Sequence, residues 1–272
     1  MIIQTAPPGK HPLAIMMYEH TALAHQFARA FGNDEFEAAE PDDLMFRVVL
    51  HHDEGWMRFD RDPVTDPTTD LPYNLVRTPA EHITVTSRLS PDFNERQHPF
   101  CGLISSMHSW GLYNGRYGLS DMVLIDTLQQ SARPLAEAML SGELERQTRL
   151  KRVLRDDWRV APRLETHKLF QNYKQLQFFD TLALYFNRTH ESERSSLQFN
   201  HVPLDCEHDT TIEIRSLGAG RYALSPYPFG ADRAEFAYGG RVIAPGQHKD
   251  KGWPAVFASA PTAWERFTLV AG

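Results

Sequence analysis

The 272-residue sequence has little cysteine and no long apolar run. Its two cysteines, Cys101 and Cys206, form no CxxC pair, which is typical of reduced thiols in a cytosolic protein and not of a disulfide framework. No stretch approaches the roughly 20 apolar residues that a membrane-spanning helix needs. Prolines and Lys10 interrupt the N-terminal segment where a secretory signal would have an apolar core. We therefore expect a soluble, cytoplasmic protein.

Positive charge is also in short supply. The net charge is −7, and the 28 Lys and Arg residues are scattered along the chain. Nucleic acids and anionic membranes attract basic surfaces, so we expect neither as a partner. The sequence also lacks a Gly-rich phosphate loop, a GxSxG elbow and a local Cys–His pair. The oligomeric state is left open.

Helical periodicity dominates the chain between residues 19 and about 200. We predict helices over 19–31, 42–53, 79–89, 98–114, 121–141, 143–157 and 164–188. Thr78 is the expected N-cap of the third helix, followed by Pro79 and Glu81. Residues 55–77 are rich in Pro, Asp and Thr, which predicts a long loop that shapes a functional pocket.

Alternating patterns replace helical ones after about residue 200. We predict a hairpin from Thr211–Ser216 and Tyr222–Leu224, a second from Ala234–Tyr238 and Arg241–Ala244, and a final strand over Arg266–Val270. The expected fold is mainly α. It has an N-terminal β hairpin (1–18), a helical domain (19–200) and a small antiparallel β module (201–272) that the N-terminal hairpin joins.

Several of the 13 histidines lie on apolar helix faces. His20 shares a face with Leu23 and Phe27, His52 and Asp53 continue the apolar stripe of their helix, and Asp180 follows Leu176 at a step of four. A buried carboxylate is costly unless it is paired or coordinates a metal. One such residue alone is more often structural, but four on three helices predict a metal site of His20, His52, Asp53 and Asp180.

Other residues are weaker candidates. His82, in the first turn of a helix, and His108, on the face of Cys101 and Ile104, are candidates for holding a second ion. His51 and Glu54 lie beside the His-Asp pair and are candidate proton carriers. Lys168, Lys174 and Arg88 are possible phosphate contacts, but surface salt bridges explain them equally well.

The order of these residues resembles the HD (His–Asp) superfamily of metal-dependent phosphohydrolases. EHTALAHQFARAF is similar to its opening helix and VVLHHDEGW to its His-Asp helix, and the likeness covers roughly residues 19–188. It implies an HD-like helical bundle. Some members add two histidines and a second metal, and His82 and His108 stand in that order. HHDEGW, LISSMHSWGLY, LQFFDTLALYF and SPYPFG also resemble a bacterial domain family of unknown function.

The resemblance implies a metal-dependent hydrolase acting on a phosphoester or phosphoanhydride of a small molecule. The cofactor would be one or two divalent ions, with Fe or Mn favoured over Mg or Zn, and Asp53 would bridge two ions. An HD-type mixed-valent diiron oxygenase is the alternative. A non-catalytic scaffold that binds a protein partner is a third. The adjacent His-His-Glu and the Gly-Tyr-Pro signatures of cyclic-dinucleotide phosphodiesterases are absent.

Overall fold

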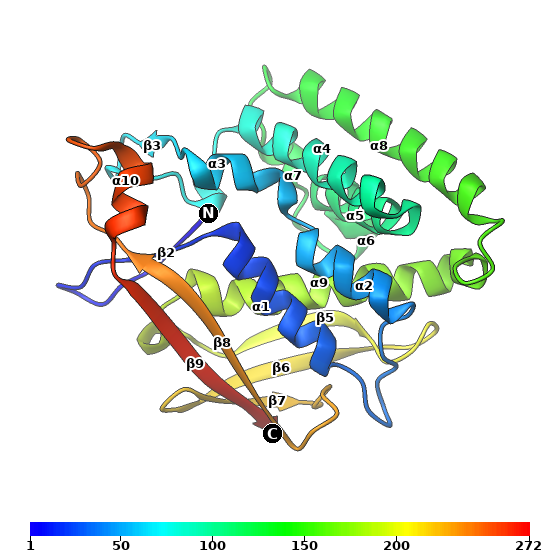
Figure 1. Cartoon of the computed structure of the whole chain (residues 1–272). Coiled ribbons are helices and arrows are strands. Elements are labelled where there is room, and N and C mark those ends of the chain that lie inside the picture. The colour runs from blue at the N-terminus through cyan, green and yellow to red at the C-terminus, as the bar shows by residue number, and fades with distance from the viewer.

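The computed structural model describes residues 1–272 and divides them between a large curled sheet and a layered set of helices (Figure 1). About 50% of the chain is helical and 20% is strand, and the main sheet has seven strands. The expectation of a mainly α, HD-like bundle with a small β module is therefore wrong. The β region is larger than expected because three of its strands extend to ten residues each, and two of these three join the remaining strands into one sheet.

The main sheet has the order β1-β2-β8-β9-β7-β6-β5. Its strands are β1 (Ile2–Gln4), β2 (Leu13–Ile15), β5 (Leu197–Pro203), β6 (Asp209–Gly218), β7 (Arg221–Ser225), β8 (Arg233–Val242) and β9 (Thr262–Ala271). The hairpin β1–β2 pairs with β8, and β9 pairs antiparallel with β8 but parallel with β7. The sheet is thus mixed and not antiparallel throughout.

The predicted second hairpin does not exist, because β8 runs straight through Gly239 and Gly240 and pairs with β9 from Arg233 to Arg241. Gly240 forms no turn but allows a neighbouring side chain to approach the strand closely. A Cβ on Gly240 would lie 2.5 Å from Cγ of Leu13 on β2. The hairpin of β6 and β7 and the final strand β9 agree with the sequence prediction.

The longer helices are α1 (Met17–Ala30), α2 (Asp42–His51), α4 (Ala80–Gln97), α5 (Pro99–Tyr113), α8 (Arg133–Leu154), α9 (Thr166–Arg188) and α10 (Gly252–Ser259). One helix, α8, replaces the two predicted over 121–141 and 143–157. It begins at Arg133, with Pro134 in its first turn, and it tolerates Gly142 in its interior. Only α6 (Gly115–Gly118) and α7 (Leu124–Thr127) precede it in this part of the chain.

The region 55–77 is not a single loop. It holds two single-turn helices, η1 (Glu54–Trp56) and η2 (Leu75–Arg77), together with α3 (Met57–Arg61) and a two-stranded ladder of β3 (Thr65–Asp66) and β4 (Leu71–Pro72). Thr78 does not cap α4, because its hydroxyl donates to the carbonyl of Asn74 instead.

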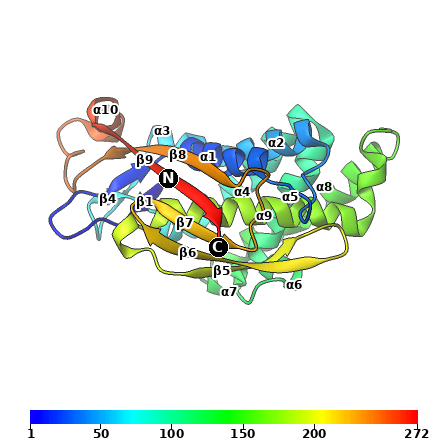
Figure 2. The ribbon, with the colours of Figure 1, turned by 90° about the horizontal axis from the view of Figure 1, so that it is seen from below.

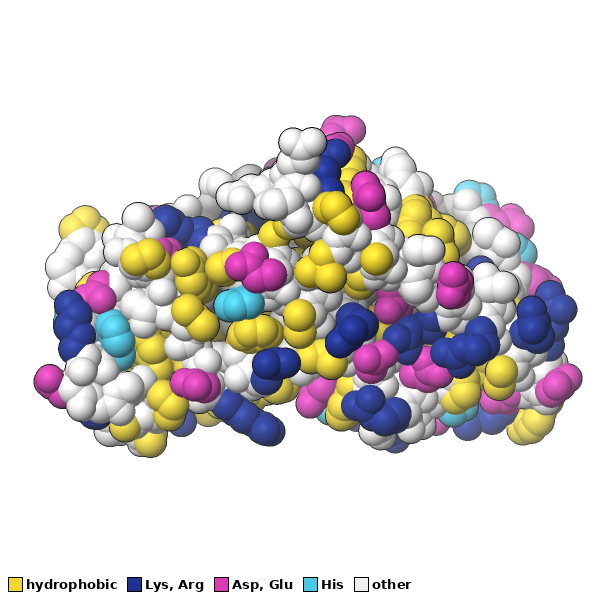
Figure 3. Space-filling view, turned by 90° about the horizontal axis from the view of Figure 1, so that it is seen from above, with side chains coloured by type: hydrophobic (Ala, Val, Ile, Leu, Met, Phe, Trp, Pro, Cys, Tyr) yellow, Lys and Arg dark blue, Asp and Glu magenta, His cyan; other side chains and the backbone are white.

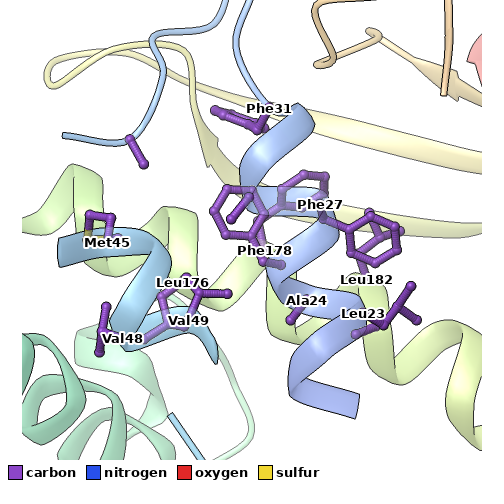
Figure 4. Close-up of a cluster of buried hydrophobic side chains, with 14 of the residues drawn as sticks. Leu23, Ala24, Phe27, Phe31, Met45, Val48, Val49, Leu176, Phe178 and Leu182 are labelled. Atoms are coloured by element: carbon purple, nitrogen blue, oxygen red, sulfur yellow. The ribbon is translucent and has the colours of Figure 1, made fainter. Parts of the chain in front are cut away.

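Helices α1 and α9 lie against the curled sheet, and α4, α5 and α8 form a layer beyond them (Figures 1 and 2). Helix α2 packs between the two sets, on α1 and α5. Figure 4 shows the apolar side chains where α1, α2 and α9 meet, among them Phe27, Val49 and Leu176. This continuous core fixes the relative positions of three helices that sequence analysis had singled out.

The upper face carries Lys and Arg intermixed with Asp and Glu (Figure 3).

Both cysteines are free thiols, with Cys101 buried against the carbonyl of Leu44. Burial raises the pKa of the Cys101 thiol to about 12, so this sulfur stays protonated at neutral pH. None of the helices combines the length and apolar character needed to cross a bilayer.

Candidate metal centre

Three helices bring His20, His52 and Asp180 together in the interior. Helix α1 provides His20, the residue after α2 is His52, and α9 provides Asp180. All three are buried, and their ligand atoms lie within 4.8 Å of one another. Nε2 of His20 is 3.1 Å from Oδ1 of Asp180, and Nε2 of His52 is 3.7 Å from the same oxygen. Three potential metal-ligand atoms therefore face one point.

Backbone and amide oxygens fix the orientation of both imidazoles. Nδ1 of His52 donates to the carbonyl of Val49 at 2.7 Å, and Nδ1 of His20 donates to Oδ1 of Asn187 at 2.9 Å. A carbonyl oxygen only accepts, so each Nδ1 carries hydrogen and each Nε2 is directed at the carboxylates. Metal-ligating histidines are oriented in the same way by such outer partners.

A second group shares His52 with Asp53 and His108, again within 4.8 Å. Oδ2 of Asp53 lies 3.7 Å from Nε2 of His52 and 4.0 Å from Nε2 of His20. The rings of His52 and His108 are 5.2 Å apart, edge to face. We call the five residues of both groups the His–Asp cluster: His20, His52, Asp53, His108 and Asp180. The Asp53 side chain is 15% exposed, so it is the member of the cluster that solvent reaches most readily.

Burial and charge pull the pKa values of the cluster apart. Burial lowers the pKa of His52, but the carboxylates of Asp53 and Asp180 outweigh it and raise the value to about 9. Burial dominates for His108, whose pKa falls to about 3, and for Asp53, whose pKa is raised with help from the charge of Asp180. Burial also disfavours ionised Asp180, yet hydrogen bonding from His20 and the nearby histidines hold its pKa well below the usual range.

Nε2 of His52 is the one nitrogen of the cluster left without a hydrogen-bond partner while buried. At 3.7 Å its two carboxylate neighbours are too distant for a hydrogen bond but suited to sharing a cation with it. The residues present therefore fit a divalent metal held by imidazole nitrogen and carboxylate oxygen.

The structure does not bring His82 into the cluster. Its ring stacks on Phe59 at 4.7 Å and lines a small cavity with Trp56 and Thr78. A position in the first turn of a helix leaves open which neighbour the side chain meets. Here α3 and η1 pack against the start of α4, so His82 contacts them instead of α5 and α9. The predicted second ion thus lacks one of its proposed ligands.

His51 and Glu54 bind each other beside the cluster. Nδ1 of His51 donates to Oε2 of Glu54 at 2.9 Å, and both side chains are partly exposed. The ring of His51 also packs on Phe93. The two residues flank the His52-Asp53 pair in sequence, and their role as proton carriers stays a prediction.

Sequence analysis missed the polar residues that support the cluster. Gln177 contacts Nδ1 of His108 through its side-chain amide at 2.6 Å, and Asn187 holds His20. Both lie on the Asp180 face of α9, at steps of three and seven. Their spacing from Asp180 places these amides on the same helix face as a buried carboxylate, and this pattern could have indicated that they support the site. Ser90 is a further support, since its hydroxyl accepts from the backbone of Gly55 and positions η1 after Asp53.

Metal affinity is expected to rise with pH, because an ion can take Nε2 of His52 only after its proton leaves. Without metal, the imidazolium stabilises the fold below pH 6.5, and this contribution is lost as the pH rises through about 9. We expect the apparent affinity for Mn²⁺ to increase by up to about tenfold per pH unit in this window. Titration of the full chain at pH 6.5, 7.5 and 8.5, followed by the free-Mn²⁺ EPR signal, measures it. An affinity independent of pH would contradict the assignment of His52 as a ligand.

Fold and site together define a mixed α/β protein with a buried His–Asp cluster where α1, α2, α5 and α9 meet. The chain belongs to the family described as "Protein of unknown function (DUF3891)", which matches residues 1–244. This match confirms the resemblance to a family of unknown function, and the matched range contains the whole cluster. No curated protein and no solved structure matches the chain.

Proposed function

We propose that the protein is a hydrolase that holds one divalent metal ion in the His–Asp cluster and cleaves a phosphoester or phosphoanhydride. The observation that carries the proposal is the buried Nε2 of His52, which has no hydrogen-bond partner although two carboxylates lie 3.7 Å away. Protonation would satisfy only this one nitrogen of the cluster. A metal ion would satisfy it together with Nε2 of His20 and the oxygens of Asp53 and Asp180.

The donor set favours particular metals. Imidazole nitrogen with carboxylate oxygen suits Mn²⁺, Fe²⁺ and Zn²⁺, whereas Mg²⁺ prefers oxygen donors. An ion of this kind supplies an acidified water as nucleophile and charge stabilisation for the phosphoryl oxygens when it is bound. The order His, His-Asp, Asp along α1, α2 and α9 resembles that of the HD phosphohydrolase superfamily, and this resemblance in the order of the residues, not in the fold, supports the same chemistry.

The chain's own residues divide the work. His20, His52 and Asp180 are buried, and they would bind the metal ion. Asn187 orients His20, and the carbonyl of Val49 orients His52. Asp53 is the partly exposed ligand, and water reaches the cluster beside it. The neighbouring pair of His51 and Glu54 accepts the proton that the attacking water gives up: Nε2 of His51 takes it, and the Glu54 carboxylate balances the charge.

A single ion is favoured over two by the same geometry. His52 belongs to both groups of the cluster but offers only Nε2, because Nδ1 is bonded to Val49. His82 is stacked on Phe59 and adds no ligand. The diiron oxygenase alternative needs a second ion, so it is the less favoured of the two enzymatic proposals.

Metal content and anaerobic turnover test the proposal. We expect close to one Mn, Fe or Zn per chain by elemental mass spectrometry after anaerobic purification. Hydrolysis of phosphoesters should proceed without O₂, stop with EDTA and return with Mn²⁺. Two irons with O₂ consumption would instead support the oxygenase. A chain that binds no metal after reconstitution would overturn both enzymes and leave the protein-binding scaffold.

A further inference from the structure

A cavity of about 550 Å³ lies on the side of α9 next to the His–Asp cluster. Strand β5 and the segment from α6 to residue 122 form its other walls. Gln177 belongs to both places: it lines the cavity and contacts Nδ1 of His108 at 2.6 Å. One side chain therefore separates the cavity from the cluster.

Arg116 is the unpaired charge of this cavity. It takes part in none of the ion pairs of the structure, and it is only partly exposed. The other basic lining residues, Lys174 and His201, both face Asp209. Asp121, the only acidic lining residue, is exposed at the rim. Arg116 thus leaves an uncompensated positive charge on the wall.

The backbone holds Arg116 in an unusual conformation. Gly115, Arg116, Tyr117 and Gly118 have φ values of 57°, 51°, 61° and 87°, a complete left-handed turn. Two of these residues are not glycine, and such strain is retained where the surrounding structure fixes it. Tyr117 supplies the anchor, because its ring packs on Trp110 at 4.5 Å and on Tyr173 at 5.2 Å.

We propose that this cavity binds the phosphate-bearing part of a small, polar substrate, with Arg116 as the residue that binds the phosphate. The inference rests on the proposed hydrolase, whose cluster is one side chain away. A guanidinium matches phosphate with paired donors. The rest of the cavity offers amides and hydroxyls, from Gln198, Asn200, Ser120 and Thr181, which suit a hydroxyl-bearing molecule such as a sugar phosphate.

Phosphate binding to the full chain tests the proposal. We expect Arg116→Gln to weaken the binding of glucose 6-phosphate at least tenfold by calorimetry, since it removes a charge-assisted contact. Arg152→Gln, an exposed charge on α8, is the matched control and should bind like wild type. Arg116→Gly favours the left-handed φ and guards against a folding defect, so it should be well folded and equally weakened.

Failure of this inference is distinguishable from failure of the proposed hydrolase. Binding by Asp180→Asn, which removes a metal ligand, should persist at a similar affinity if the phosphate sits on Arg116. Equal binding by wild type and both Arg116 variants, or loss of binding in Asp180→Asn alone, would overturn the assignment of Arg116. Inorganic phosphate should bind more weakly than glucose 6-phosphate, and equal affinities would overturn the role of the amide-lined part.

Discussion

Asp180→Asn is expected to strip the metal from the protein and abolish hydrolysis. Oδ1 of Asp180 is 3.1 Å from His20 and 3.7 Å from His52, so it is the oxygen that both imidazoles face. Asparagine keeps the volume but removes the charge that a cation needs. Changes to outer partners cost roughly 10–100-fold in metal affinity, and loss of a direct ligand should exceed that range. Metal per chain by elemental mass spectrometry and the Mn²⁺ dissociation constant are the readouts.

The matched control is Glu143→Gln, which neutralises another buried carboxylate, paired with Arg146 on α8 and outside the cluster. It should keep wild-type metal content. Without the Asp180 charge, the pKa of His52 should also fall from about 9, and metal-free Asp180→Asn should lose the stability that wild type gains below pH 6.5. Full metal content in Asp180→Asn would place the ion elsewhere.

Arg194→Met is expected to destabilise the fold by about 3 kcal/mol, near the lower end of the cost of breaking a buried ion pair, because the Glu265 side chain left behind is 20% exposed. The Arg194 guanidinium is paired with Glu265 of β9, and it donates to Tyr222 of β7 at 2.7 Å and to the carbonyl of Phe186 on α9 at 2.7 Å. It also lies over the Phe186 ring, at 5.0 Å. Methionine fills a similar volume but leaves the Glu265 carboxylate without its ion-pair partner.

Urea denaturation measures the effect, with an unchanged slope and a lower midpoint. Arg233→Met removes a comparable but exposed pair with Glu235 and should cost less than about 1 kcal/mol. Adding Glu265→Gln to Arg194→Met should recover part of the lost stability, because no charge is then left unpaired. A loss for Arg194→Met as small as that for Arg233→Met would show that the buried pair adds nothing to the fold.

Local sequence patterns were sufficient to place His20, His52 and Asp180 together, because each continues an apolar stripe that must face the core. Local sequence patterns could not predict the position of His82. Helical spacing gives a residue's face on its own helix, but the neighbour of that face depends on tertiary packing, and here it is Phe59.

The sheet was underestimated for a related reason. Alternation located β6, β7 and part of β9, but Gly239-Gly240 indicated a turn where β8 passes close to Leu13. The pairing of β9 with β7 and β8 joins segments tens of residues apart and leaves no local trace. The size of the sheet therefore could not be read from strand patterns alone.

The place of β9 in the strand order has a consequence for the edges of the sheet. β1, β2 and β8 form one half of the sheet and β7, β6 and β5 form the other, and only β9 joins them. It is also the last of the seven strands in chain order. Without β9, β8 and β7 each present an open edge, which is a template for pairing with another chain. Loss or displacement of β9 would therefore split the sheet into two halves and expose the edges of β8 and β7 to another chain.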